Sequence, residues 1–492
     1  MINDFNYVSP ESEGIDSKDI LEFLSFVERL NINIYSFLLA KNGNIVAEGY
    51  FKPMDENFKH RQYSCSKTYV SIGVGLLYGE GKIKLEDRLI DYFPECVRDD
   101  MDEWTKNCTI EQALMMSVPG ITGYTRYEDW GTYFFHKDRP GVKPAGAMFS
   151  YSTVATVVLN RLVEKLTGKK LLEYMRPLFD KIGVAKDIWC VETPDGTSWG
   201  GSGVICTTRD FAKFGELLMN MGNYKGEQLI PLDYMQKATS ALICNKKSNA
   251  TGNYSSSGYG YQIWKSPHGF WLAGMGGQAI FCFPEKNMIF AYNSDTQVAA
   301  GLDGKTMMGD LVDHFIYERI GEKKEAGADY EKLKEKLANL KIKTDFGTKT
   351  HERAKLVNGK TYELKENRCG WKNLRLDFTE DEGSLTYENA RGVKTIKFGL
   401  CEFKKTTFPE THYYDRKIRV PANREFDCLA CGAWNYDNLV IKVFITDTNK
   451  GNLFINIGFT DDLKQTSASV LKVAEFFLDD YNGYVAGQLK ED

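Results

Sequence analysis

Hydrophobic and polar positions near the N-terminus follow first a helical and then an extended pattern. Between residues 18 and 31, apolar side chains recur at the spacing of one helix face. Two apolar runs follow, at residues 35–40 and 45–51, with Asn42-Gly43 between them, a pair typical of β-hairpin turns. The pattern predicts a helix followed by a strand hairpin. The apolar residues of the helix face are Ile20, Phe23, Leu24, Val27 and Leu30.

A mainly helical stretch then runs to about residue 220, and extended apolar segments return beyond it. A helix at residues 306–320 follows the last of them. Strands at both ends with helices between them predict a single α/β domain whose sheet is assembled from the two ends of residues 1–321. The expected returning strands are residues 260–264, 270–273, 279–283 and 288–292.

The pattern changes after residue 321. Residues 322–350 are rich in Lys and Glu, with Leu333, Leu337 and Leu340 at helical spacing, which predicts an amphipathic helical linker. Residues 351–492 instead contain short alternating segments separated by turn residues, which predict a small antiparallel sheet or barrel. The expected strands of this C-terminal domain are residues 361–364, 374–378, 384–387, 393–398, 439–445 and 453–459.

Composition narrows the class of protein. With 492 residues, 42% of them hydrophobic and 13% aromatic, the chain can fill more than one core. A formal charge of −5 without blocks of basic residues argues against a nucleic-acid partner. We see neither an apolar run that could span a bilayer nor a secretory signal, so we expect no membrane partner and a cytoplasmic location.

Eleven cysteines are scattered along the chain. Cys428 and Cys431 have the spacing of a redox or zinc pair, but neither a second pair nor a histidine cluster completes such a site. We therefore expect reduced, mostly buried thiols, with neither a metal nor a cofactor.

The tetrad Ser64–Lys67 precedes a run of ten mostly apolar residues, 68–77, that predicts a buried helix. Ser64 would lie at the helix start, where free backbone N–H groups favour an oxyanion, and Lys67 would lie one turn further along the same face. This is the arrangement of a serine nucleophile activated by lysine. The same spacing recurs at Ser469 and Lys472, without a buried helix behind it. On the tetrad alone, a capping serine beside a solvated lysine is the preferred interpretation.

Two later elements change that interpretation. Phe149–Thr153 leads into a second apolar helix, and Ala273–Gln278 is a glycine-rich turn between two expected strands. Taken separately, the first is an aromatic residue at the start of a helix and the second is a tight hairpin turn. Together and in this order, with matching segments at residues 81–95, 109–117 and 200–215, they resemble the serine β-lactamase/penicillin-binding-protein-like superfamily over residues 10–320. The resemblance is to its class C and esterase branch, and most of all to nylon-oligomer hydrolases.

The resemblance implies a fold and a mechanism. It implies an antiparallel sheet flanked by helices with a helical subdomain, in which Ser64 attacks a carbonyl to form an acyl-enzyme. Lys67 and Tyr151 would act as the acid–base pair, and the ordinary pKa of a lysine, about 10.4, would have to be lowered. The backbone N–H groups of Ser64 and Gln278 would form the oxyanion hole.

The substrate-binding positions depart from the family pattern. The family's Tyr-x-Asn is Tyr151-Ser152-Thr153 here, which removes an amide that contacts substrate. Its Lys-Thr-Gly triplet is Met275-Gly276-Gly277, so the cation that holds a β-lactam carboxylate is replaced by a thioether. The glycines would let the strand lie close to a substrate. We therefore expect a small neutral ester or amide as the substrate.

Other functions stay open on sequence grounds. A D-amino-acid peptidase, a weak β-lactamase and a catalytically retired penicillin-binding-like ligand sensor share these motifs. A Ser-His-Asp hydrolase is less favoured, because the chain has six histidines but no Gly-x-Ser-x-Gly elbow. The C-terminal domain carries no recognisable chemistry, and the sequence leaves two roles open for it: covering the cleft, or self-association into a homo-oligomer.

Overall fold

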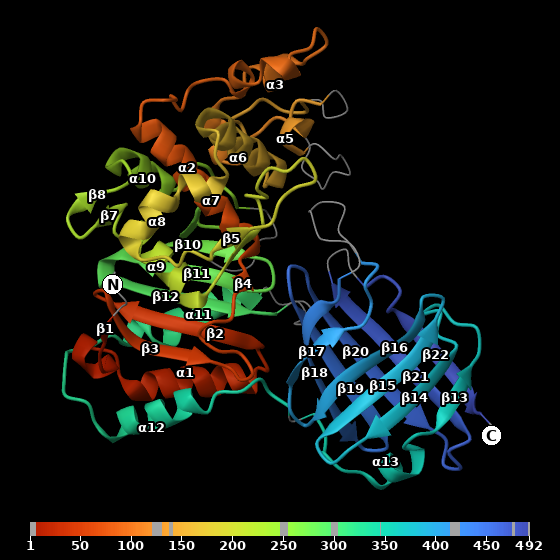
Figure 1. The fold of residues 1–492 in the computed structure, drawn as a ribbon. Coiled ribbons are helices and arrows are strands. Elements are labelled where there is room, and N and C mark those ends of the chain that lie inside the picture. The colour runs from red at the N-terminus through yellow and green to blue at the C-terminus, as the bar shows by residue number, and fades with distance from the viewer. Residues whose placement is uncertain are drawn as a thin grey trace. The chain divides into compact units, whose positions relative to one another are not determined.

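The structure is a computed structural model that describes residues 6–120, 130–136, 141–246, 254–296, 304–344, 346–413, 424–474 and 478–490 (Figure 1). The contacts divide the chain into two compact units, the first ending at Leu340 and the second beginning at Lys341.

Unit 1 is built on a seven-stranded sheet in the order β1-β3-β2-β12-β11-β10-β9. The short first strand is parallel to its neighbour, and the other neighbouring pairs are antiparallel. The central pairing joins β2, near the N-terminus, to β12, near the end of the unit, as the sequence predicted. The strands are β1 (Asn6–Tyr7), β2 (Ile34–Lys41), β3 (Asn44–Tyr50), β9 (Trp264–Ser266), β10 (Gly269–Gly274), β11 (Gln278–Phe283) and β12 (Met288–Ser294).

Helices cover both faces of this sheet. On one face Phe23 of α1 (Ser17–Arg29) meets Phe290 edge-on, with 5.6 Å between the ring centroids. On the other face Gly215 of α9 (Thr208–Met219) lies against Ile280, where an added Cβ would come within 2.7 Å of a side-chain carbon. The two contacts lie on opposite faces, because Phe290 pairs with Phe281 and successive residues of a strand point in opposite directions.

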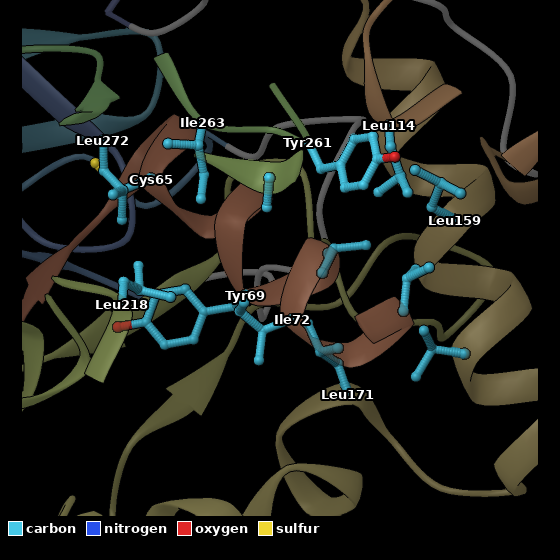
Figure 2. Close-up of a cluster of buried hydrophobic side chains, with 14 of the residues drawn as sticks. Cys65, Tyr69, Ile72, Leu114, Leu159, Leu171, Leu218, Tyr261, Ile263 and Leu272 are labelled. Atoms are coloured by element: carbon cyan, nitrogen blue, oxygen red, sulfur yellow. The ribbon is translucent and has the colours of Figure 1, made fainter. Parts of the chain in front are cut away.

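The helical part of unit 1 centres on α2 (Ser66–Gly79), which is buried from Ser66 to Gly75. Figure 2 shows Tyr69 and Ile72 of this helix among side chains from other elements. Tyr69 stacks on Phe214, with ring centroids 3.9 Å apart. The other helices of the unit are α3 (Glu103–Lys106), α4 (Ile110–Leu114), α5 (Trp130–Tyr133), α6 (Thr153–Thr167), α7 (Leu171–Tyr174), α8 (Arg176–Ile182), α10 (Leu232–Ala238), α11 (Gly304–Phe315) and α12 (Ala328–Ala338).

Five shorter strands complete unit 1 and lie outside the main sheet. They form a three-stranded and a two-stranded sheet. The strands are β4 (His60–Arg61), β5 (Trp189–Cys190), β6 (Val204–Cys206), β7 (Asn223–Tyr224) and β8 (Glu227–Gln228), the first three forming the larger sheet.

The amphipathic helix expected within residues 322–350 is present as α12. It packs on α1, where Lys336 forms a 2.6 Å ion pair with Glu28, and unit 1 extends to Leu340. The expected strand at residues 260–264 needs correction, because β9 begins only at Trp264, after Gln262 adopts a left-handed φ of 58°.

Unit 2 is a closed barrel with the short helix α13 (Glu352–Val357), and the closure decides between the sheet and the barrel that the sequence left open. Neighbouring strands are antiparallel along the sheet, and the barrel closes through a short parallel pairing of β16 with β18 at Gly399↔Cys431 and Leu400↔Gly432. Buried and more exposed residues alternate along β15, so apolar side chains fill the interior. The strands are β13 (Thr361–Leu364), β14 (Asn373–Phe378), β15 (Glu382–Asn389), β16 (Gly392–Leu400), β17 (Lys404–Phe408), β18 (Phe426–Asn435), β19 (Asn438–Thr446), β20 (Lys450–Phe459), β21 (Gln465–Ala474) and β22 (Gly483–Leu489).

All eleven cysteines lie in the described ranges, and each is a free thiol. Burial raises the pKa of Cys428 and Cys431 above that of an ordinary thiol. Across the described ranges, three or more His, Cys, Asp or Glu side chains nowhere converge as metal ligands would. Among the same residues, no helix combines the length and the apolar character that a membrane span requires.

Candidate active site

Ser64 lies in a 3-10 turn, Tyr63–Cys65, that leads directly into α2. Its side chain is partly exposed, whereas Tyr63 and Cys65 are buried. Tyr63 has a left-handed φ of 47°, which is costly for a bulky residue and is found most often at functional sites. This backbone conformation turns the chain sharply just before Ser64, while the preceding strand β4 stays paired with β6.

Lys67 lies on the first turn of α2 with only 1% of its surface exposed. Its Nζ donates to Ser64 Oγ at 3.1 Å and to the backbone carbonyl of Gly201 at 2.6 Å. The structure therefore brings together the serine and the lysine that the spacing predicted. The second contact was not predicted, and it fixes the direction from which the Lys67 side chain approaches Ser64.

The Gly201 carbonyl belongs to a loop that is wedged between two helices. An added Cβ at Gly200 would come within 2.3 Å of Val70 on α2, and one at Gly201 within 2.6 Å of Thr153 on α6. Asn160 Nδ2 holds the start of the loop by donating to the Ser198 carbonyl at 2.9 Å. The glycines are therefore needed for close approach, and the Gly-Gly-Ser-Gly run was the sequence signal for this loop.

Tyr151 precedes α6, whose N-cap is Ser152. Its ring stacks on Trp264 with centroids 5.6 Å apart and 24° between the planes, and Lys67 Nζ lies 5.1 Å from the ring centroid. Tyr259 packs edge-on against Tyr151. Complete burial, with a smaller contribution from Tyr151, raises the pKa of Tyr259 well above its usual value. The structure thus places Tyr151 beside Lys67, and Trp264 and Tyr259 are neighbours that sequence reasoning did not identify.

The glycine turn between β10 and β11 is held by side chains. Gly276 and Gly277 have φ values of 74° and 83°, which glycine adopts easily. Ser294 Oγ lies 2.9 Å from both glycine carbonyls, and Gln278 Nε2 donates to the carbonyls of Met275 and Ser294 at 3.0 and 2.8 Å. These hydrogen bonds to backbone carbonyls hold the turn in place.

The turn also contacts the nucleophile segment, because Cys65 Sγ donates to the Gln278 carbonyl at 3.3 Å. Ser64 and Gln278 are therefore close in space, as the expected oxyanion hole requires. Met275 is partly exposed beside the buried glycines. Thr153 is the first residue of α6 with its methyl group toward Gly201, so its expected contact with substrate stays a prediction.

Two alternatives lose support from the structure. Ser469 and Lys472 lie three residues apart in strand β21 of unit 2, so their side chains point to opposite faces. His60, the histidine nearest Ser64 in sequence, is enclosed by Tyr35 and Phe58, and its Nε2 lies 3.3 Å from Ser36 Oγ. It is thus directed into the core toward Ser36.

Comparisons with known proteins identify the family of the chain. The sequence model of the family described as Beta-lactamase matches residues 26–311. A 6-aminohexanoate-dimer hydrolase of Paenarthrobacter ureafaciens is 24% identical over 223 residues, 41% of this chain and 56% of that protein, so the match spans little more than half of that relative.

Two solved structures share the fold. A putative 6-aminohexanoate-dimer hydrolase from Bacillus anthracis is 20% identical with a TM-score of 0.50, covering 65% of this chain and 89% of that one. A family VIII carboxylesterase is 17% identical with a TM-score of 0.50, covering 65% of this chain and 100% of that one. The family match extends over more than half of the 492 residues. The protein therefore belongs to the β-lactamase family of hydrolase folds, as the sequence motifs indicated.

Proposed function

We propose that the protein is a serine hydrolase that acts through an acyl-enzyme on a small, neutral ester or amide. The observation that carries the proposal is the contact between Lys67 Nζ and Ser64 Oγ at 3.1 Å, made by a lysine that is almost completely buried. A general base must lie within hydrogen-bond reach of the proton that it removes, and Lys67 does.

In the proposed first step, Ser64 Oγ bonds to the substrate carbonyl carbon and its proton passes to neutral Lys67. The N–H groups of Ser64 and Gln278 stabilise the oxyanion, and the fixed glycine turn supports this assignment. Tyr151, which lies beside Lys67, protonates the leaving group as the bond to it breaks. A water molecule then attacks the acyl-enzyme, giving its proton to the same pair and releasing Ser64.

The side chains at the glycine turn support a neutral substrate. Met275 offers no charge at the position where a cation would hold a β-lactam carboxylate. Two similar proteins are named as a 6-aminohexanoate-dimer hydrolase and a family VIII carboxylesterase, which supports the ester and amide classes for this chain as well.

A substrate panel tests the proposal. We expect p-nitrophenyl esters of graded chain length to be turned over with a kcat/KM at least tenfold above that for nitrocefin. Losing a charge-assisted contact costs about 1.5–3 kcal/mol, which corresponds to roughly tenfold to more than a hundredfold in affinity. D-alanyl amides and a linear aminohexanoate dimer complete the panel, with Ser64→Ala as the control.

Each other outcome points to a different function. Nitrocefin turnover above that of short esters would identify a β-lactamase, and preferred cleavage of D-alanyl amides a peptidase. Stable labelling of Ser64 without turnover of any substrate would identify a ligand sensor. Any of these results would overturn the proposal.

A further inference from the structure

A buried arginine lies directly behind the nucleophile turn. Arg61 has 2% of its surface exposed. Its Nε donates to the Ser202 carbonyl at 2.9 Å and its Nη2 to Ser202 Oγ at 3.1 Å. The guanidinium carbon lies 4.3 Å from the ring centroid of Tyr63 and 4.7 Å from that of Trp199. Burying a guanidinium is expensive, so such a residue is retained where its geometry is needed.

The two segments that Arg61 contacts are the two that place the proposed catalytic pair. Tyr63, with its left-handed φ of 47°, immediately precedes Ser64. Ser202 immediately follows Gly201, whose carbonyl accepts from Lys67 Nζ. The backbone joins the same segments, since Arg61 pairs with Ile205 in the β4–β6 sheet. The side chain then reaches back from that pairing to Ser202.

We propose that Arg61 is a positioning residue that sets the orientation of the Lys67 amine toward Ser64 by holding the Gly201 carbonyl in place. The inference rests on the proposed function. A neutral amine carries two N–H bonds and one lone pair. When one N–H is donated to the Gly201 carbonyl, the lone pair can be directed at the Ser64 hydroxyl. A displaced carbonyl takes the amine with it, and the proton transfer loses its alignment.

Arginine is suited to this task in a way that lysine is not. Its planar group donates two bonds in fixed directions and stacks between two aromatic rings, whereas an ammonium is a compact point charge. Arg61→Lys therefore keeps the positive charge and removes the planar group that donates two hydrogen bonds in fixed directions. Misplacing a catalytic group by about 1 Å costs on the order of a hundredfold in rate.

The test measures acylation by a p-nitrophenyl ester across a range of pH. We expect Arg61→Lys to lower the acylation rate by about tenfold to a hundredfold with little change in KM. We also expect the acidic limb of the pH profile to move to lower pH. The ammonium form of Lys67 would lose a carbonyl acceptor, and losing a hydrogen bond to the charged form lowers the pKa of an amine.

A double-variant cycle separates positioning from a purely structural role. In a Lys67→Ala background, Arg61→Lys should lower the residual acylation rate less than threefold, because the amine that Arg61 orients is absent. The matched control is Arg176→Lys, since Arg176, the first residue of α8, also donates to two backbone carbonyls and lies over a phenylalanine ring. We expect this control to keep the wild-type rate and pH profile.

Equal losses in both backgrounds with an unmoved pH profile would overturn the inference. If Arg61→Lys does not fold, Ser202→Ala removes the Nη2 contact, keeps the carbonyl that Nε contacts, and should shift the profile in the same direction with a several-fold loss of rate. An unshifted profile in a folded Ser202→Ala protein would then refute the positioning role. Failure of the proposed function is distinguishable, because the wild-type protein itself would lack Ser64-dependent turnover.

Discussion

Adding one methyl group at Gly277 should disable the glycine turn. The residue has a φ of 83°, and an added Cβ would lie 2.2 Å from Ser294 Oγ. The backbone strain of an alanine in this region is about 1–2 kcal/mol. The Ser294 hydroxyl would also have to leave the two glycine carbonyls that it contacts at 2.9 Å, at about 1 kcal/mol for a lost hydrogen bond. The total is about 2–3 kcal/mol of strain concentrated in the proposed oxyanion turn.

The turn is expected to relieve this strain by moving. A displacement of about 1 Å at the oxyanion donors should lower kcat for a p-nitrophenyl ester by roughly a hundredfold. Gly226→Ala is the matched control, because Gly226 has a φ of 88° and no neighbouring atom within 4 Å of an added Cβ. It should lose stability through backbone strain alone and keep its kcat.

A second substitution tests the cause. In Gly277→Ala/Ser294→Ala the colliding oxygen is absent, and the next atom, Thr296 Oγ1, lies 3.1 Å from the added Cβ. We expect this double variant to recover several-fold in kcat relative to Gly277→Ala. Wild-type kcat in Gly277→Ala, or equal losses in Gly277→Ala and Gly226→Ala, would refute the argument that this turn is part of the catalytic site.

Three further results are expected. Lys67→Ala and Tyr151→Phe should each lower kcat about a hundredfold, and the double variant should lose little more than the worse single one, because the pair acts as a unit; near-full ester hydrolysis by Tyr151→Phe would reassign the proton shuttle. Burial raises the pKa of Asp313 from 3.8 to about 6, so its contribution to stability is present below pH 3.8 and is lost as the pH rises through 6. As the pH rises from 4 to 7, the unfolding free energy of Asp313→Asn should therefore increase relative to that of the wild type by about 1–2 kcal/mol, as measured by urea unfolding. A difference between the two proteins that is constant with pH would contradict this. In the barrel, Glu410 is 1% exposed and accepts hydrogen bonds from two tyrosines and an asparagine. Glu410→Ala leaves these buried donors without their acceptor and should cost about 3–5 kcal/mol of unfolding free energy, and a loss below about 1 kcal/mol would show that the cluster is dispensable.

Local patterns predicted much of the fold because the signals for its elements are local. The hairpin of β2 and β3 follows from Asn42-Gly43 between apolar runs, and β13 (Thr361–Leu364) matches the expected strand. Strands β21 and β22 were missed because their outward positions hold small or polar residues such as Ser467 and Ala486, which have weak strand propensity. Only pairing within the closed barrel defines them.

In the candidate site too, contacts between residues close in sequence were predictable and contacts between distant residues were not. Ser64 and Lys67 were predictable because three residues in a helical segment bring their side chains together. The Gly201 carbonyl and Arg61 were not, because their contacts join positions 134 and 141 residues apart in the sequence. Such contacts depend on how β4 and β6 pair, which no local pattern encodes.

Covalent labelling with a fluorophosphonate probe, followed by peptide mapping, tests whether Ser64 is the nucleophile. We expect a single adduct on the peptide that contains Ser64, and its complete loss in a folded Ser64→Ala protein. An adduct that survives this substitution, or that maps to another residue such as Ser469, would show that Ser64 is not the nucleophile.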